Sequence, residues 1–137
     1  MLDNGETITL PRSGQPPLRF RGELLAESCG ERQAGREQTR WHELAVYRTA
    51  GGVFVVRVAY LTRWEGELDR DEATVTDAAG VGKVLRDYDP TSPVQGYPPG
   101  GAYAERQARL CADVRRRYEE QVSSLLAAAP EFAEEVQ

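Results

Sequence analysis

Two tryptophans enclose the stretch that most constrains the fold, Trp41 to Trp64, which reads WHELAVYRTAGGVFVVRVAYLTRW. Its second half, residues 53–61, is rich in the β-branched and aromatic residues that suit a half-buried strand. Turn-forming residues at 49–52 separate this half from a second apolar run. We therefore predict a β-hairpin across residues 41–64, at the centre of the sheet.

The register of this hairpin depends on the length of its loop, and the sequence leaves two alternatives open. On the second strand, the even-numbered residues beginning with Phe54 share one face. A two-residue loop places the set containing Tyr47 on that face. A three-residue loop with a left-handed glycine places the set containing Leu44 there instead.

Two further strands are expected before the hairpin. Residues 7–10 form a short candidate strand. Residues 18–28 alternate apolar and charged side chains, which predicts one wet face and one buried face that carries Leu18, Phe20, Leu24 and Ala26. Gly22, on the apolar face, marks either a bulge or a close approach by another element. Residues 30–40 are polar and glycine-punctuated, and we expect an exposed, mobile loop there.

After the hairpin, residues 68–76 are ambiguous. Residues 73–76 suit a further strand, whereas residues 71–73 are also able to open a helix; we prefer the strand. Asp77 then resembles a helix N-cap, and the apolar spacing that follows predicts an amphipathic helix over 78–88.

Residues 89–101 hold four prolines and three glycines, a composition typical of an extended linker. Within it, Tyr97 and the two prolines that follow either recognise a partner or lie across the chain's own domain; we prefer the second. A periodic pattern over 102–129 then predicts a long C-terminal helix. The expected fold is α+β: an antiparallel β-meander of about four strands, packed by the helices 78–88 and 102–129.

The composition indicates one folded domain over residues 1–137, because 40% of the residues are hydrophobic and 28% charged. No apolar run is long enough to span a bilayer, and no secretory signal is apparent, so we expect a cytoplasmic protein with no membrane partner. All but one of the 17 basic residues are arginine, which favours a GC-rich, bacterial source. Cys29 and Cys111 match no metal-ligand spacing and are expected to be buried free thiols.

No catalytic, metal-binding or cofactor-binding set emerges from the sequence. His42 is the single histidine. Its neighbour Glu43 points to the opposite face of a strand, so a structural role for His42 is favoured over that of a general base. Four carboxylates would share one face of an extended chain and offer oxygen ligands to a cation, but a solvated acidic turn is the preferred interpretation. These are Glu65, Glu67, Asp69 and Asp71.

The leading functional hypothesis is a non-catalytic interaction module whose partner is a second copy of itself or another protein. The long helix extends roughly 40 Å, whereas average strands reach only about 20 Å, so part of its apolar stripe would overhang the sheet. An overhanging stripe requires a partner. The expected homodimer interface comprises Val114, Tyr118, Val122 and Leu125.

Two alternatives remain. The first is a ligand-binding or enzymatic domain with an aromatic pocket between the concave face of the sheet and the linker. That pocket would be lined by Trp41, Tyr60, Trp64, Tyr97 and Tyr103. The second is nucleic-acid binding through the arginine-rich helix, which the net charge of −5 and the interleaved acidic residues disfavour.

Overall fold

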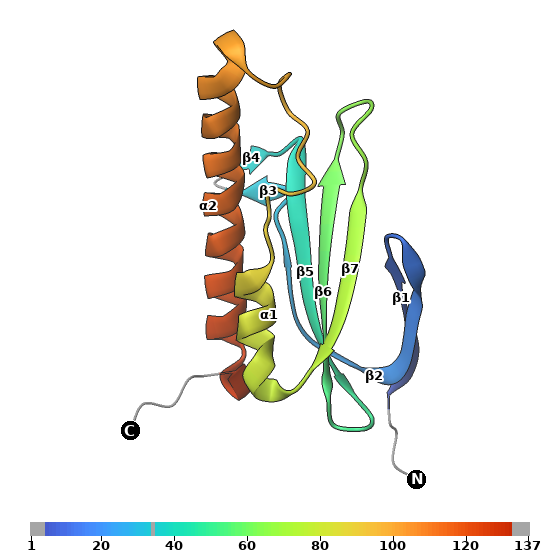
Figure 1. The fold of residues 1–137 in the computed structure, drawn as a ribbon. Coiled ribbons are helices and arrows are strands. Elements are labelled where there is room, and N and C mark those ends of the chain that lie inside the picture. Colours follow the sequence, from blue (N-terminus) through green and yellow to red (C-terminus); the bar gives the residue numbers. More distant parts are fainter. Residues whose placement is uncertain (1–4, 34, 133–137) are drawn as a thin grey trace.

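The computed structural model describes residues 5–33 and 35–132, and their architecture is α+β (Figure 1). Five strands form one antiparallel sheet in sequential order: β1 (Glu6–Arg12), β2 (Gln15–Cys29), β5 (Arg40–Thr49), β6 (Phe54–Thr62) and β7 (Arg70–Thr76). The helices are α1 (Val81–Asp87) and α2 (Ala104–Ala128), with single 3₁₀ turns η1 (Ala78–Gly80), η2 (Gly101–Tyr103) and η3 (Pro130–Phe132). The α+β class and the meander are confirmed, with five strands where we expected about four.

The sheet curls away from the helices, so that β1 returns to β7 on the opposite side (Figure 1). Two hydrogen bonds fasten this return. The Ser13 amide donates to the Asp71 carbonyl at 2.8 Å, and the Asp71 amide donates to Ser13 Oγ at 2.9 Å. A small apolar core built on Leu10, Val55 and Ala73 fills the inside of the curl.

The central hairpin has a three-residue loop. The Thr49 amide donates to the Val53 carbonyl at 2.8 Å, and Gly52 adopts a left-handed φ of 90°. Val46 therefore pairs with Val56, and the Leu44 set shares the helix-facing side with the Phe54 set. Of the two registers left open by the sequence, the structure has the second, because a left-handed glycine adds one residue to the turn.

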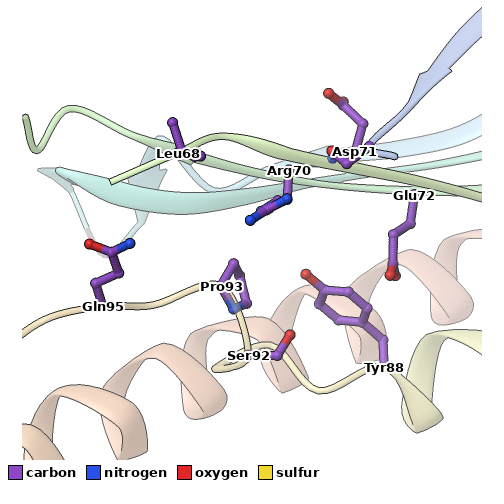
Figure 2. A pocket seen from close by; sticks show the side chains of 9 residues that line it. Leu68, Arg70, Asp71, Glu72, Tyr88, Ser92, Pro93 and Gln95 are labelled. Carbon is purple, nitrogen blue, oxygen red and sulfur yellow. The ribbon is translucent and has the colours of Figure 1, made fainter. Parts of the chain in front are cut away.

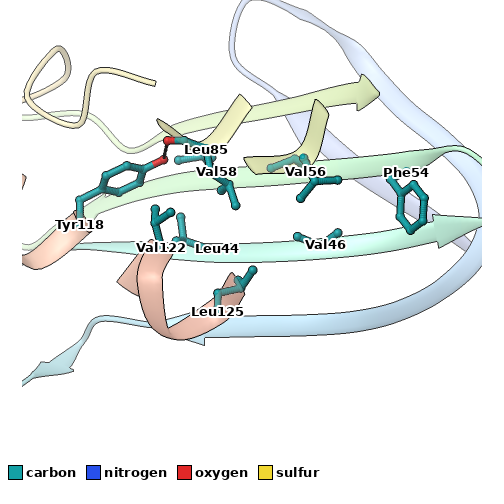
Figure 3. Packing of buried hydrophobic residues seen from close by; sticks show 10 residues of the cluster. Leu44, Val46, Phe54, Val56, Val58, Leu85, Tyr118, Val122 and Leu125 are labelled. Carbon is teal, nitrogen blue, oxygen red and sulfur yellow. Dashed lines mark hydrogen bonds between the residues drawn. The ribbon is translucent and has the colours of Figure 1, made fainter. Parts of the chain in front are cut away.

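The main core lies between this sheet face and the two helices (Figure 3). The Tyr118 hydroxyl donates to the Leu85 carbonyl and ties α2 to α1 inside it. The side chains that we expected at a dimer interface lie here, at 5% exposure or less: Val114, Tyr118, Val122 and Leu125. The reason is length. The 10 residues of β5 span about 33 Å, so the 25 residues of α2, about 37 Å, scarcely overhang the sheet.

Strand β2 departs from simple alternation. Phe20 packs into the core inside the curl, but a bulge between Leu24 and Ala26 turns Leu25 and Ala26 toward the helix side and leaves Leu24 45% exposed. Our expectation that Phe20, Leu24 and Ala26 share one buried face was wrong: the extra residue of the bulge moves Ala26 to the helix side, whereas Leu24 stays on the face of Tyr47 and is exposed there. Gly22 marks a close approach instead: an added Cβ would lie 2.2 Å from the Arg48 carbonyl oxygen.

Of the remaining predictions about the fold, some are confirmed and some differ from the structure. The expected loop at 30–40 contains a two-strand ribbon, β3 (Arg32–Gln33) with β4 (Arg36–Glu37), which Gln33 Nε2 ties to the Arg117 carbonyl at 3.1 Å. Residues 70–76 are a strand, as preferred, and the Asp77 carboxylate caps the Gly80 amide at 2.8 Å. Both cysteines are free, but Cys29 is exposed rather than buried. No helix among the described residues is long and apolar enough to cross a membrane.

Candidate ligand site beside strand β7

The linker of residues 89–101 lies against its own domain. Pro90 is fully buried, and the Tyr97 amide donates to Gln107 Oε1 of α2 at 2.8 Å. At Gly96 an added Cβ would lie only 2.3 Å from the same oxygen, so the backbone approaches α2 as closely as a glycine allows. These contacts hold the linker at a fixed distance from the neighbouring edge of the sheet.

A cavity of about 370 Å³ separates the linker from β7 (Figure 2). This volume lies within the range of small-molecule sites, although the lining is more polar than is usual for them. The lining residues come from three regions, the β1–β2 turn, β7 with the residue two before it, and the linker with Tyr88: Ser13, Leu68, Arg70, Asp71, Glu72, Tyr88, Ser92, Pro93 and Gln95.

Two opposite charges on β7 face this cavity. Arg70 and Glu72 are two residues apart, so they share one face of the strand. Arg70 pairs with Tyr60 across the sheet, and Tyr60 with His42, so the cavity adjoins one continuous polar and aromatic row. Figure 2 shows the Arg70 and Glu72 side chains directed from β7 toward the linker, with the Tyr88 hydroxyl directed back at β7.

The polar ends of these side chains have no partner in residues 5–33 and 35–132 that would neutralise or satisfy them. Among the described residues, no ion pair or hydrogen bond engages the Arg70 guanidinium, the Glu72 carboxylate or the Tyr88 hydroxyl. The remaining arginines of β5, β6 and β7 are all paired: Arg40 with Glu67, Arg48 with Glu23 and Glu131, and Arg57 with Glu43 and Asp71. The cavity therefore gathers charges that the fold itself does not use.

Tyr88 forms the inner wall of the cavity and stays protonated. Burial, together with the nearby negative charges of Glu72 and Asp89, raises the pKa of the Tyr88 phenol above its ordinary value. A neutral phenol both donates and accepts hydrogen bonds. The Tyr88 hydroxyl is thus available either to an anion or to a cation that enters the cavity.

Behind Tyr88 lies His42, which is 2% exposed. The rings of Tyr60, Tyr88 and Tyr118 surround its imidazole, with centroids 5.1 to 5.7 Å away. Burial, reinforced by the charge of Arg117, lowers the pKa of His42 to about 4. Its Nε2 has no hydrogen-bond partner among the described residues. His42 is therefore a neutral core histidine that packs against Tyr88, and within the described ranges no carboxylate accepts a hydrogen bond from it as a general base requires.

A buried ion pair lies next to Tyr60, on the same face of the sheet as His42. Arg40 Nε and Glu67 Oε1 lie 2.9 Å apart, and the Tyr60 hydroxyl donates to the same carboxylate. Burial opposes ionisation of Glu67, but the hydrogen bonds from Arg40 and Tyr60 outweigh it and hold its pKa below the ordinary value. Here every charge has a partner.

Three carboxylates of the acidic segment are engaged by other groups of the protein. Glu67 belongs to the buried ion pair, the Asp69 carboxylate accepts from the Thr62 amide at 3.0 Å, and Asp71 lies beside Arg57. No group of three or more candidate metal ligands is found in the described part of the chain.

The aromatic residues expected around a pocket lie apart from one another, and none lines the cavity. Trp41 and Tyr60 are buried on opposite faces of the sheet. Trp64 is 53% exposed, and the Arg40 guanidinium lies over its ring, with Cζ 4.8 Å from the ring centroid. Tyr97 and Tyr103 stack on each other 5.8 Å apart, where the linker meets α2. The cavity does lie between sheet and linker, but not on the concave face that we expected, because the sheet curls away from the linker.

Two arginines of α2 are engaged by acids of the same helix. Arg116 bridges Asp113 and Glu120, at 2.6 and 3.0 Å. Arg117 is buried and donates to Asp113 and to the Arg40 carbonyl. These pairs compensate part of the positive charge that the sequence places on α2.

Comparisons with family models, with curated proteins and with solved structures find no match for this chain. The site therefore rests on its own geometry. Sequence reasoning missed the residues of this site. One signal was available, because in a strand over residues 70–76 the side chains of Arg70 and Glu72 lie on the same face. What brings them to Tyr88 and Gln95 is the course of the linker, which local pattern does not contain.

Proposed function

We propose that this protein binds a small polar ligand carrying an anionic group in the cavity between β7 and the linker. The observation that carries the proposal is the Arg70 guanidinium, which faces a cavity of about 370 Å³ and has no partner among the described residues. A guanidinium presents several donors in a planar fork that suits carboxylate and phosphate groups.

Two neutral groups are positioned to complete such a site, the Tyr88 hydroxyl and the side-chain amide of Gln95. Ser92 also lines the cavity, but its hydroxyl already donates to the Asp89 carbonyl at 3.0 Å. Polar groups that converge on one space fix the orientation of a ligand, whereas an open arginine alone would bind any anion weakly. Binding, rather than catalysis, is proposed because no nucleophile or base with an orienting partner lies in the lining.

The homodimer hypothesis has less support. Its four residues pack in the core of a single chain, and a second copy would reach them only by opening that core. The outer side of α2 carries ion pairs instead of an apolar stripe.

The test is calorimetric titration of the purified protein with a panel of phosphate, acetate, propionate, butyrate, glycine, β-alanine and γ-aminobutyrate. At least one compound is expected to bind the wild type and to bind Arg70→Ala about tenfold or more weakly. Arg19→Ala is the matched control, because Arg19 is also an exposed arginine on a strand, β2, but lies away from the cavity. Equal binding to Arg70→Ala, or no binding by any member of the panel, would contradict the proposal.

A further inference from the structure

The cavity beside β7 presents two opposite charges rather than one, and this bears on the class of ligand. The inference rests on the proposed function and narrows it. Glu72 lines the same cavity as Arg70, on the same face of β7. A site for a simple anion gains nothing from a carboxylate in its wall, since like charges repel at short range.

Arg70 and Glu72 do not neutralise each other. Their Cα atoms are about 7 Å apart, a spacing that long side chains can bridge, yet no ion pair joins them. In Figure 2 the Tyr88 hydroxyl is directed toward β7, in the region between the Arg70 and Glu72 side chains. The charge of Glu72 is close enough to help raise the pKa of the Tyr88 phenol.

From this arrangement we infer that the ligand is dipolar: its anionic group binds at Arg70, and a cationic group, such as an ammonium, binds at Glu72. The two ends of the cavity carry the two charges. Gln95 and Pro93 of the linker lie on the Arg70 side, and Tyr88 separates that side from Glu72 (Figure 2). The phenol bridges the two halves, since it donates to an anion and accepts from an ammonium. Amino carboxylates are the simplest members of this class.

Two further acidic groups, Asp71, which also lines the cavity, and Asp89 are already engaged. Asp71 hydrogen-bonds Ser13 through its backbone and faces Arg57. The Asp89 carboxylate accepts from the Thr91 amide and hydroxyl, at 3.0 and 2.7 Å, and lies 3.3 Å from Arg115. Glu72 is therefore the carboxylate that remains available to a ligand cation.

The experiment compares compounds that differ only in the amino group: glycine with acetate, β-alanine with propionate, and γ-aminobutyrate with butyrate. Each is titrated calorimetrically into the wild type, Glu72→Gln and the control Glu6→Gln, an exposed carboxylate of β1 distant from β7 in sequence. The wild type and Glu6→Gln are expected to prefer the amino carboxylate about tenfold in at least one pair. Glu72→Gln is expected to lose that preference while it keeps its affinity for the plain carboxylate.

Different results would overturn anion binding at Arg70 and the dipolar nature of the ligand. Equal affinity of the wild type for both members of every pair, or an unchanged preference in Glu72→Gln, would overturn the dipolar inference and leave anion binding at Arg70 standing. No Arg70-dependent binding by any compound would overturn the proposed function and the inference with it.

Discussion

Two arginines on the helix-facing side of one sheet have opposite environments. Arg40, on β5, has a side chain only 11% exposed, is paired with Glu67 and is covered by Trp64. Arg70, on β7, faces a cavity and has no partner among the described residues. A buried charge requires a partner to offset its desolvation, and an exposed one does not. Arg40 therefore contributes to the stability of the fold, whereas the Arg70 guanidinium is available to bind a ligand.

The strongest effect is expected in the main core, between the helix-facing side of the sheet and α2. Val114→Glu combined with Leu125→Glu places two charges in side-chain positions that are 3% exposed. We expect the double variant to unfold, with a loss above about 5 kcal/mol, as judged by circular dichroism. Ala112→Glu combined with Ser124→Glu, at exposed positions of the same helix, is expected to stay folded. A folded double core variant that merely changed its oligomeric state would contradict the core assignment.

The second effect breaks the ion pair itself. Glu67→Ala leaves the Arg40 guanidinium buried without its carboxylate and the Tyr60 hydroxyl without its acceptor. The free energy of unfolding is expected to fall by about 3 to 5 kcal/mol in urea titrations. The exposed neighbour Glu65 provides the control, and Glu65→Ala is expected to change stability by less than about 0.5 kcal/mol. A similar small change in Glu67→Ala would show that Arg40 needs no partner.

The third effect depends on pH. His42 has a folded-state pKa of about 4 against an ordinary value of 6.5, so between these values the unfolded chain binds more protons than the folded one. The contribution of His42 to the free energy of unfolding is therefore complete above pH 6.5. It is lost as the pH falls from 6.5 toward 4, and the loss amounts to about 3 kcal/mol. His42→Phe keeps an aromatic ring among Tyr60, Tyr88 and Tyr118 and removes the titration.

The measurement for His42 is the free energy of unfolding of both proteins at several pH values from 7 to 4.5. The wild type is expected to lose more stability than His42→Phe across this interval, and the difference removes the contribution of carboxylates such as Glu67 that both proteins share. Parallel curves for the two proteins would contradict a buried, neutral histidine.

The smallest effect is on the other arginine. Arg70→Ala removes a side chain with no partner among the described residues, so the free energy of unfolding is expected to change by less than about 0.5 kcal/mol. Chemical denaturation of the apo protein checks this. A loss of 1 kcal/mol or more would mean that Arg70 stabilises the fold and would weaken its assignment to a ligand.

Local sequence patterns predicted most of the fold. Alternation and turn chemistry located the hairpin of β5 and β6, and helical spacing located α2. What differed had a non-local cause. A bulge moves Ala26 off the face that we expected it to share with Phe20 and Leu24. The stripe from Val114 to Leu125, which we expected to extend beyond the sheet, is buried within the chain, because the strands are longer than average. Both differences concern how elements meet, which periodicity within one element does not record.

The residues of the candidate site differ from those that the sequence suggested, for a related reason. We expected an aromatic pocket between sheet and linker, and the cavity found there has a lining without those aromatic residues. Aromatic residues such as Tyr60 and Trp41 have enough apolar area to be drawn into the core. The residues left facing the cavity are those with charges the core does not accept, Arg70 and Glu72. Whether a charge finds an internal partner depends on tertiary packing.

The most direct test of the account is to observe where a ligand binds. We would titrate the strongest binder from the amino carboxylate series into ¹⁵N-labelled protein and follow the NMR signals of the Arg70 side chain and of the backbone around Tyr88, Ser92 and Gln95. The account predicts saturable shifts concentrated on these residues and abolished in Arg70→Ala. Shifts centred instead on the exposed aromatic residues Trp64, Tyr97 or Tyr103, or no shifts at saturating ligand, would contradict it.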